Sequence, residues 1–331
     1  MRPTALIVFA LTVIGQSVVP AASAVRQPAS IFRFQSDGFW LNLHHFLYVL
    51  GRAEAGFPDR QRRAVIDAPT DQARVLPSLS EDDRRVWTAT VTAYSKGLSL
   101  KDTALDQELM AVTTAMQRRD DAEPATARID PGLAALLEQA APVYRKAWWP
   151  AHQQANRSEV RELEGLVAQH GPAIVSYITR VYQERWPADG FPVHVTAYTN
   201  WTGAYSTGDR LLVVSSVDPG TKGLLGLEIV FHEAMHQWDD AMLRRVRRLA
   251  TNNATAPVSD LLTHALIFYT AGEAVRALAP GHVPYAEWYG FWQQRELGAF
   301  KTALDTSWKP YLQGQGTLDQ ALTALLKVPT G

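Results

Sequence analysis

Two histidines, His232 and His236, end a run of mainly apolar residues, and this arrangement limits the folds open to the chain. The run from Leu224 to Phe231 predicts a buried helix. Four residues turn a helix by about 400°, so both imidazoles project from one face, one turn apart. Burying them together with Glu233 costs free energy unless these side chains are paired or bind a metal. The sequence therefore predicts a helix over residues 221 to 249 that presents a metal site.

The histidine spacing is typical of zinc ligands, because two neutral imidazoles at this separation can hold one ion. Zinc lowers the pKa of a bound water to roughly 7. The Glu233 carboxylate follows the first histidine, where it can take a proton from that water without being a ligand. We therefore predict Zn2+ as the cofactor and Glu233 as a general base. The alternative is a core helix with two hydrogen-bonded histidines.

A catalytic zinc site needs a third protein ligand and keeps a fourth position for water. Glu273 is the first candidate, because its small neighbours Gly272 and Ala274 let the carboxylate approach an adjacent helix. It falls on the next predicted helix, residues 259 to 279. His264 is the alternative, and it lies nine residues earlier, on the opposite face of a straight helix. Both can face the metal only if the helix bends, for instance at Gly272.

Tyr269 shares the Glu273 face, because it lies four residues earlier on the same predicted helix. We predict Tyr269 and His264 as candidate donors to the oxyanion that forms on an attacked carbonyl. Either side chain can equally be a satisfied core residue. Asp239 and Asp240 follow the second histidine on its own helix, so we expect them beside the ligands or at the surface.

The set of His232, Glu233 and His236 with a later Gly272-Glu273 resembles the gluzincin branch of the zincin metallopeptidases, the thermolysin-like arrangement. The resemblance covers residues 190 to 280. It implies that the two histidines and Glu273 bind zinc and that Glu233 is the general base. It also implies a strand whose edge binds extended peptide, and residues 210 to 217 are placed to form it. The gap before Glu273 is longer than in that pattern, and Ala277 stands where the pattern has an aspartate.

Strand-forming segments are few. Residues 191 to 199 and 210 to 217 are rich in β-branched and aromatic residues, which predicts two antiparallel strands joined by a loop over residues 200 to 209. Residues 133 to 154 and 160 to 186 favour helices broken at Pro150 and near Gly171-Pro172. The predicted fold class is α+β and mainly helical, with a zincin-like core, a small antiparallel sheet and an HExxH helix.

The first residues are typical of an export signal. Arg2 precedes an apolar run from Ala5 to Val19, which is too short for a comfortable membrane span, and Ala22-Ser23-Ala24 supplies small residues for cleavage. We expect a signal peptide over residues 1–24, cleavage after Ala24, and a secreted or periplasmic protein with no stable membrane span. The alternative is an uncleaved anchor.

A charged, proline-bearing stretch over residues 118 to 132 is the best linker candidate. It suggests an N-terminal helical region over residues 25–125 and a zincin-like catalytic region over residues 126–331. The chain has no cysteine, which excludes disulfides, thiol catalysis and cysteine-ligated metal. Its net charge of -1 gives no electrostatic case for binding nucleic acid.

These observations predict an exported zinc metallopeptidase whose partner is a peptide or protein substrate. Two alternatives remain open: a non-catalytic exported protein that keeps a zincin fold for binding, and a zinc amidase that acts on a non-peptide substrate. The intact Glu233 argues against a binding role alone, because such a role needs no base. The motif by itself does not separate peptide from other amide bonds.

Overall fold

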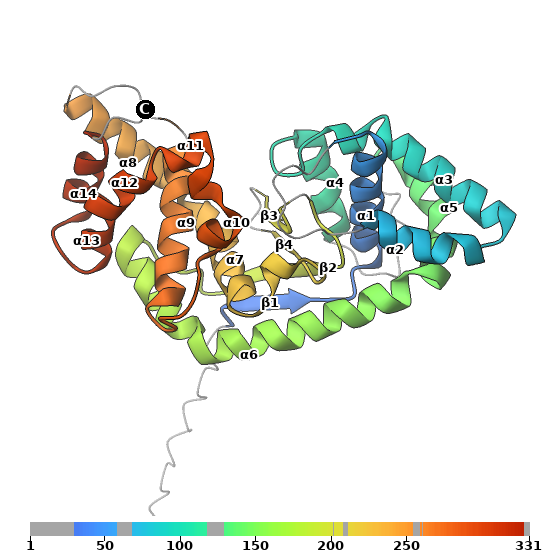
Figure 1. Ribbon diagram of the computed structural model, residues 1–331, viewed down its shortest axis with the longest axis horizontal. Coiled ribbons are helices and arrows are strands. Elements are labelled where there is room, and N and C mark those ends of the chain that lie inside the picture. The colour runs from blue at the N-terminus through green and yellow to red at the C-terminus, as the bar shows by residue number, and fades with distance from the viewer. Residues whose placement is uncertain are drawn as a thin grey trace, which may run out of the picture.

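The computed structural model describes residues 30–57, 68–117, 129–200, 202–207, 211–253, 259 and 261–327. Over these residues the chain is mainly helical and contains one four-stranded mixed sheet (Figure 1), which confirms the predicted α+β class. The predicted signal peptide, the boundary near residue 125 and most of the predicted linker lie outside the described residues. None of the described helices combines the length and the apolar character that a membrane span requires.

The sheet has the strand order β1-β2-β4-β3. Strands β1 (Phe32–Gln35), β2 (Phe191–Thr196) and β4 (Leu212–Ser215) run parallel, and β3 (Ala204–Ser206) pairs antiparallel with β4 at one edge. β2 and β4 are buried almost throughout, which explains why apart from His194 and Ser215 their residues are apolar or β-branched instead of alternating with polar residues.

The predicted antiparallel pairing of the two strand segments is wrong. β2 and β4 are parallel neighbours, because the chain between them forms β3 and then turns back. β3 lies inside the stretch predicted to be a loop, and three residues next to Gly203 give too little strand signal to be recognised. β4, predicted to provide the sheet edge, is internal, and β3 provides it instead. β1 was not predicted at all.

A first hydrophobic core lies among the N-terminal helices. Its largest contact stacks Trp87 on Trp148, with ring centroids 4.5 Å apart, and Phe46 packs beside Trp87. The elements around this core are α1 (Phe39–Glu54), α2 (Ala68–Val75), η1 (Leu76–Ser78), α3 (Glu81–Ser95), η2 (Leu98–Leu100), α4 (Gln107–Gln117) and α5 (Pro131–Ala147).

A second core joins the sheet to the helices that follow it. The central elements are η4 (Pro219–Thr221), α7 (Gly223–Met235), η5 (His236–Trp238), α8 (Asp239–Asn252) and α9 (Leu261–Arg276). The C-terminal elements are α10 (Tyr285–Tyr289), η6 (Phe291–Gln293), α11 (Arg295–Gly298), α12 (Lys301–Ala303), the π-helical turn η7 (Leu304–Trp308), α13 (Lys309–Leu312) and α14 (Leu318–Leu325).

Helix α6 (Trp149–Tyr182) has 34 residues and runs below both cores (Figure 1). The predicted break at Gly171-Pro172 is wrong, because α6 continues through it. Gly171 serves close packing instead, since a Cβ there would meet Ile31 Cδ1 at 2.8 Å. Pro150 falls in the first turn of α6, where a missing amide hydrogen costs no helical hydrogen bond.

Gly190 fixes the start of the sheet. Its φ is 65°, a left-handed conformation that favours glycine, and an added Cβ would lie 2.0 Å from the Ser30 carbonyl oxygen. The following amide of Phe191 donates a hydrogen bond to the Ile31 carbonyl, which sets β1 beside β2.

We expect Gly190→Ala to lower the free energy of unfolding by about 2–4 kcal/mol, because the new Cβ adds strain and collides with backbone. The matched control is Gly165→Ala on the exposed face of α6, where a Cβ meets nothing within 4 Å. That change should be neutral or stabilise by up to about 1 kcal/mol. Urea unfolding followed by circular dichroism measures both, and equal midpoints would contradict the role given to Gly190.

Candidate metal centre

Helix α7 is buried from Gly226 to its last residue, Met235, because it lies between α6, the sheet and α9. The helix predicted over residues 221 to 249 is interrupted. α7 ends at Met235, residues His236–Trp238 form the 3-10 turn η5, and α8 begins at Asp239. His232 and Glu233 therefore come from a rigid buried helix, whereas His236 opens the turn that follows it.

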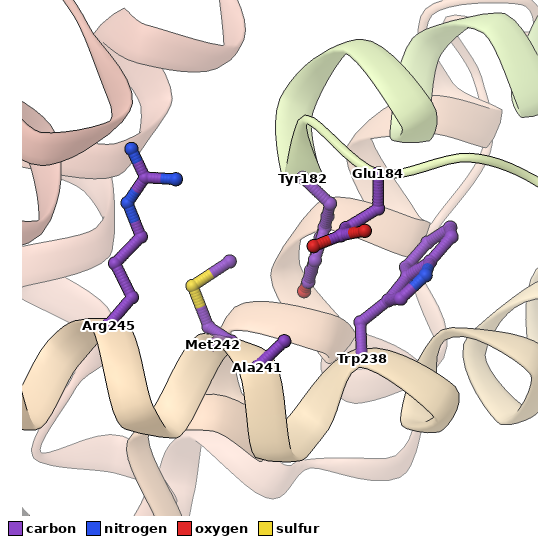
Figure 2. A pocket seen from close by; sticks show the side chains of 6 residues that line it. All are labelled: Tyr182, Glu184, Trp238, Ala241, Met242 and Arg245. Atoms are coloured by element: carbon purple, nitrogen blue, oxygen red, sulfur yellow. The ribbon is translucent and has the colours of Figure 1, made fainter.

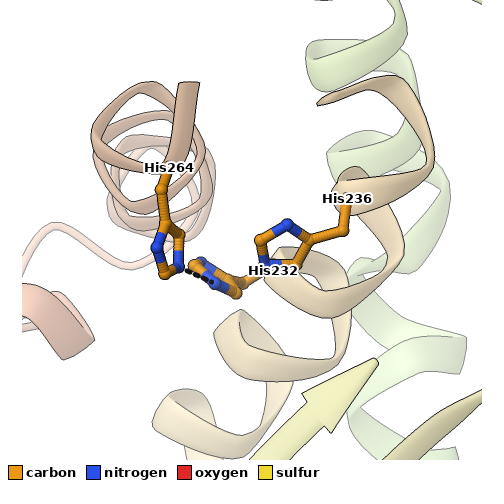
Figure 3. A group of neighbouring side chains, drawn as sticks. All are labelled: His232, His236 and His264. Carbon is orange, nitrogen blue, oxygen red and sulfur yellow. Dashed lines mark hydrogen bonds between the residues drawn. The ribbon is translucent and has the colours of Figure 1, made fainter. Parts of the chain in front are cut away.

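Three imidazoles converge between α7, η5 and α9 (Figure 3). One ring nitrogen from each of His232, His236 and His264 lies within 4.8 Å of the other two. Among the described residues, this group can hold a metal ion. His232 is buried, and the other two are partly exposed, so one side of the group is accessible.

The separation of two of the three nitrogens fits a tetrahedral ion. His264 Nε2 lies 3.3 Å from His232 Nε2. A tetrahedral zinc site with Zn–N bonds of about 2.0–2.1 Å separates its ligand nitrogens by roughly 3.3–3.4 Å. His232 Nδ1 is buried and has no hydrogen-bond partner among the described residues. The donor set of three imidazoles is one that zinc accepts, so the residues present fit this metal.

Phe268 sets the orientation of two of the rings. It lies one turn after His264 on α9 and stacks on that imidazole, with centroids 4.6 Å apart. Its ring is also 4.1 Å from that of His232. The phenyl ring therefore packs against both imidazoles, restricts their rotation and covers one side of the group.

Burial keeps His232 and His264 neutral, which a metal ligand must be. Burial and the charges of His236 and His264 lower the pKa of His232 well below its usual value. Burial, and then the charge of His236, lower the pKa of His264 to about 3. Both rings thus keep a free nitrogen lone pair for a cation at neutral pH.

His236 differs because a carboxylate holds it. Its Nδ1 lies 2.5 Å from Asp239 Oδ2, and the 3-10 turn brings these two residues together because positions three apart are eclipsed there. Burial lowers the pKa of His236, but the Asp239 hydrogen bond and the negative charges of Glu233 and Asp239 outweigh it, so the net shift is upward. The bond fixes the ring and leaves Nε2 for a metal, as carboxylate–histidine pairs do in metal sites.

Glu233 is the acidic neighbour of the group. This residue is 7% exposed, and its helix packs against β3. Burial raises the pKa of its carboxyl above the usual value, whereas His236 and Ser206 act in the opposite direction. A raised pKa suits a group that must accept a proton and later release it.

A second buried carboxylate, Glu228, ties α7 to the segment after α9. It lies 2.6 Å from His282 Nε2, and the backbone N–H of Tyr285 donates to it at 2.9 Å. Burial raises its pKa, against the effect of the His282 hydrogen bond. Glu228 is one turn before His232 on α7, so this contact helps to set the position of α7 relative to α9.

The structure does not bring Glu273 into the metal-binding group. Its carboxylate accepts a hydrogen bond from Arg276 Nη1 at 2.6 Å. Tyr269, predicted as an oxyanion donor, instead donates its hydroxyl to Asp305 at 2.7 Å. His264 and Phe268 share the α9 face that meets α7, while Tyr269 and Glu273 share another face.

Among the described residues, His264 joins His232 and His236 in the group that can hold a metal ion, and the sequence offered His264 as the alternative third ligand. No bend at Gly272 is present, because α9 continues through it to Arg276. Gly272 instead allows close packing, since a Cβ there would meet Pro284 Cβ at 2.6 Å. The sequence reasoning missed Ser206 entirely. Asp239 lies beside the ligands, one of the two places expected for it.

A surface pocket lies between the end of α6 and the start of α8 (Figure 2). None of the three histidines lines it, and the Arg245 guanidinium at its rim donates to Asp319 at 2.5 Å. The residues lining it are Tyr182, Glu184, Trp238, Ala241, Met242 and Arg245. This pocket is separate from the histidine group.

Comparison with known proteins adds no family to this geometry. No protein-family model matches the chain, and no significant match was found among curated proteins or solved structures.

We expect His264→Ala to weaken zinc binding by more than about 100-fold, because it removes a nitrogen from the group. The control is Glu273→Gln, which should keep one zinc per chain, because that carboxylate pairs with Arg276. Competition with a chromophoric chelator measures both affinities. Loss of zinc from the Glu273 variant and not from the His264 variant would reverse the assignment.

Asp239→Asn should weaken zinc binding by about 10- to 100-fold, because it removes the charge that holds the His236 ring. Asp240→Asn is the control, because no hydrogen bond ties that neighbouring residue to His236. The same chelator titration applies. Equal affinities for the two variants would show that the Asp239 contact does not support the ligand.

Proposed function

We propose that this chain is an exported zinc-dependent hydrolase that cleaves amide bonds in peptides. One observation carries the proposal: three imidazole nitrogens within 4.8 Å of one another lie beside the buried carboxylate of Glu233. Export rests on the N-terminal sequence, where a positive residue, a short apolar run and Ala22-Ser23-Ala24 are typical of a signal peptide.

When bound, zinc supplies a Lewis acid that lowers the pKa of a coordinated water to roughly 7 and polarises a carbonyl. Glu233 accepts the proton of the attacking water and delivers it to the leaving amine. Its partly desolvated carboxyl favours both steps, because its raised pKa lies nearer to neutrality than that of an exposed glutamate. His232, His236 and His264 would hold the ion through one ring nitrogen each.

The edge strand β3 supports a peptide substrate. Hydrogen-bonded pairs alternate with non-bonded pairs along an antiparallel ladder. The Gly203 carbonyl accepts from the Ser215 amide, and the Thr207 amide donates to the Leu211 carbonyl. The backbone groups of Ala204 and Ser206 therefore face away from β4, and the Ala204 carbonyl there accepts a hydrogen bond from Thr202 Oγ1 at 3.0 Å. An extended peptide can add to such an edge by main-chain hydrogen bonds, and its specificity does not depend on a deep pocket.

The proposal includes a zincin-like core with one departure from the gluzincin pattern. The motif helix and a sheet edge beside it agree with that resemblance, whereas a histidine from α9 takes the place of the glutamate ligand. Three imidazoles would bring no negative charge of their own to the ion, and the carboxylate bonded to one of the rings is that of Asp239, which pairs with His236. Glu233 supplies the neighbouring negative charge.

Glu233→Gln should keep one zinc per chain and lower kcat for peptide hydrolysis by about 10²- to 10⁴-fold, because the amide cannot accept the proton. The measurement is cleavage of a mixed peptide library, read by mass spectrometry, with zinc content determined on the same samples. Glu228→Gln is the matched control for a buried glutamate of α7 outside the group, and we expect it to affect stability more than kcat.

A wild-type protein that binds zinc tightly and cleaves no peptide contradicts the proposed peptidase. In that case, hydrolysis of non-peptide amides identifies an amidase, and its absence identifies a binding protein.

A further inference from the structure

Tyr285, the first residue of α10, is bonded both to the helix that carries His232 and to the segment that leads into β3 (Figure 1). Its backbone N–H donates to the Glu228 carboxylate at 2.9 Å, and Glu228 lies one turn before His232 on α7. Its hydroxyl donates to the Thr202 carbonyl at 2.8 Å. This single residue therefore spans the distance from α7 to the start of the sheet edge.

The aromatic ring of Tyr285 continues the packing around the metal-binding group. It lies parallel to the ring of Phe268, with an interplanar angle of 2° and centroids 6.2 Å apart. Phe268 in turn packs against His232 and His264. Tyr285 is 2% exposed, and a Cβ on Gly220 would lie 3.0 Å from its Cε2, so η4 also packs against the ring. An enclosed ring of this kind holds its hydroxyl in a defined place.

The segment that accepts this hydroxyl is well defined before β3 begins. The Thr202 amide donates to Asn200 Oδ1 at 3.0 Å. Gly203 follows with a φ of 84°, and a Cβ there would lie 2.7 Å from Asp218 Oδ2. The Gly203 carbonyl then accepts from the Ser215 amide at 2.8 Å, which begins the pairing with β4. The Tyr285 bond therefore acts directly before the first paired residue of the edge strand.

The side chain of Tyr205 ties the same strand to elements away from the imidazoles. Its hydroxyl lies 2.7 Å from His45 Nε2 on α1 and 3.2 Å from Thr113 Oγ1 on α4. These helices surround the N-terminal core and carry none of the three metal-binding histidines. β3 also packs against α7, but apolar packing is non-directional, whereas a hydrogen bond sets a direction.

A strand of three residues that pairs with β4 alone depends on neighbouring elements for a fixed position. We propose that Tyr285 is a positioning residue that holds the β3 edge, and with it a bound peptide, at a fixed place relative to the three imidazoles. The amide ties Tyr285 to α7, the ring packs beside Phe268, and the hydroxyl holds the backbone ahead of β3. The peptide and its cleavage rest on the proposed function, whereas the anchoring rests on the contacts of Tyr285 alone.

Tyr311 provides a matched control. Its hydroxyl donates to the backbone carbonyl of Val181 at 2.8 Å, and this bond joins α13 to the end of α6. Tyr285→Phe and Tyr311→Phe therefore remove the same group from two buried tyrosines, each bonded to a backbone carbonyl. A merely structural role predicts similar consequences for the two variants, whereas positioning predicts that only Tyr285→Phe acts on β3.

The first measurement is amide hydrogen exchange of the full chain without added metal, read by mass spectrometry on the peptide that covers residues 202–207. We expect Tyr285→Phe to speed exchange there at least about 10-fold, because the segment loses its bond to α10. Tyr311→Phe should leave this peptide as in the wild type. Unchanged exchange in Tyr285→Phe, or equal acceleration in both variants, overturns the anchoring.

The second measurement is hydrolysis of an extended peptide by the zinc-loaded chain. Tyr285→Phe should lower kcat by about 10- to 100-fold and change KM by less than about twofold, because the edge still pairs with the peptide but no longer holds it in place relative to the metal. Tyr311→Phe should keep both constants. Zinc content is determined on the same samples, and we expect one zinc per chain in both variants.

The two readouts distinguish this inference from the proposed hydrolase. Inactive wild type overturns the hydrolase, and the exchange rates then still decide whether Tyr285 holds β3. Active wild type with normal kcat in Tyr285→Phe overturns the positioning role and leaves the hydrolase intact. Loss of zinc from Tyr285→Phe also contradicts the inference, because a residue that positions the edge strand leaves the ligands in place.

Discussion

The buried contact between α7 and α9 is the interaction on which the candidate centre depends. Two histidine nitrogens meet at 3.3 Å only in one register of these helices, because a shift of one residue would turn His264 away. Glu228, one turn before His232, helps to hold that register through its bonds to His282 and the amide of Tyr285, which follow α9. Burying the Glu228 carboxylate costs free energy unless it is paired. A different packing of the two helices would break these bonds and is therefore disfavoured.

The histidine pair and its helix could be predicted from sequence, because spacing along a helix is a local property. The third ligand could not be decided in that way. His264 and Glu273 lie on opposite faces of α9, and the choice between them depends on which face meets α7. That choice is made by tertiary packing, through Phe268 against both rings and Gly272 against Pro284. In the sequence, the one local indication that the His264 face meets α7 was Phe268, which follows His264 by one turn.

The sheet, too, could be predicted from the sequence only in part. The buried strands β2 and β4 were visible as apolar, β-branched runs, but their mutual direction depends on a three-residue strand that the sequence hides. β3 supplies a sheet edge and packs against α7, the helix that carries Glu233. Short edge strands carry little propensity, and their position is set by what packs on them. Here the packing partners are α7 on one side and His45 and Thr113 on the other.

Helix α6 packs into both hydrophobic cores and so connects them. Its first turns pack into the N-terminal core, where His152 meets Phe46 with centroids 5.0 Å apart, and Leu163 to Val181 belong to the core of the sheet. The three histidines and the glutamate come from a stretch of only 33 residues. A shortened chain that kept α6, the sheet and this stretch but lacked the N-terminal helices would expose the apolar residues in the first half of α6. The unit that folds is therefore larger than the unit that carries the chemistry.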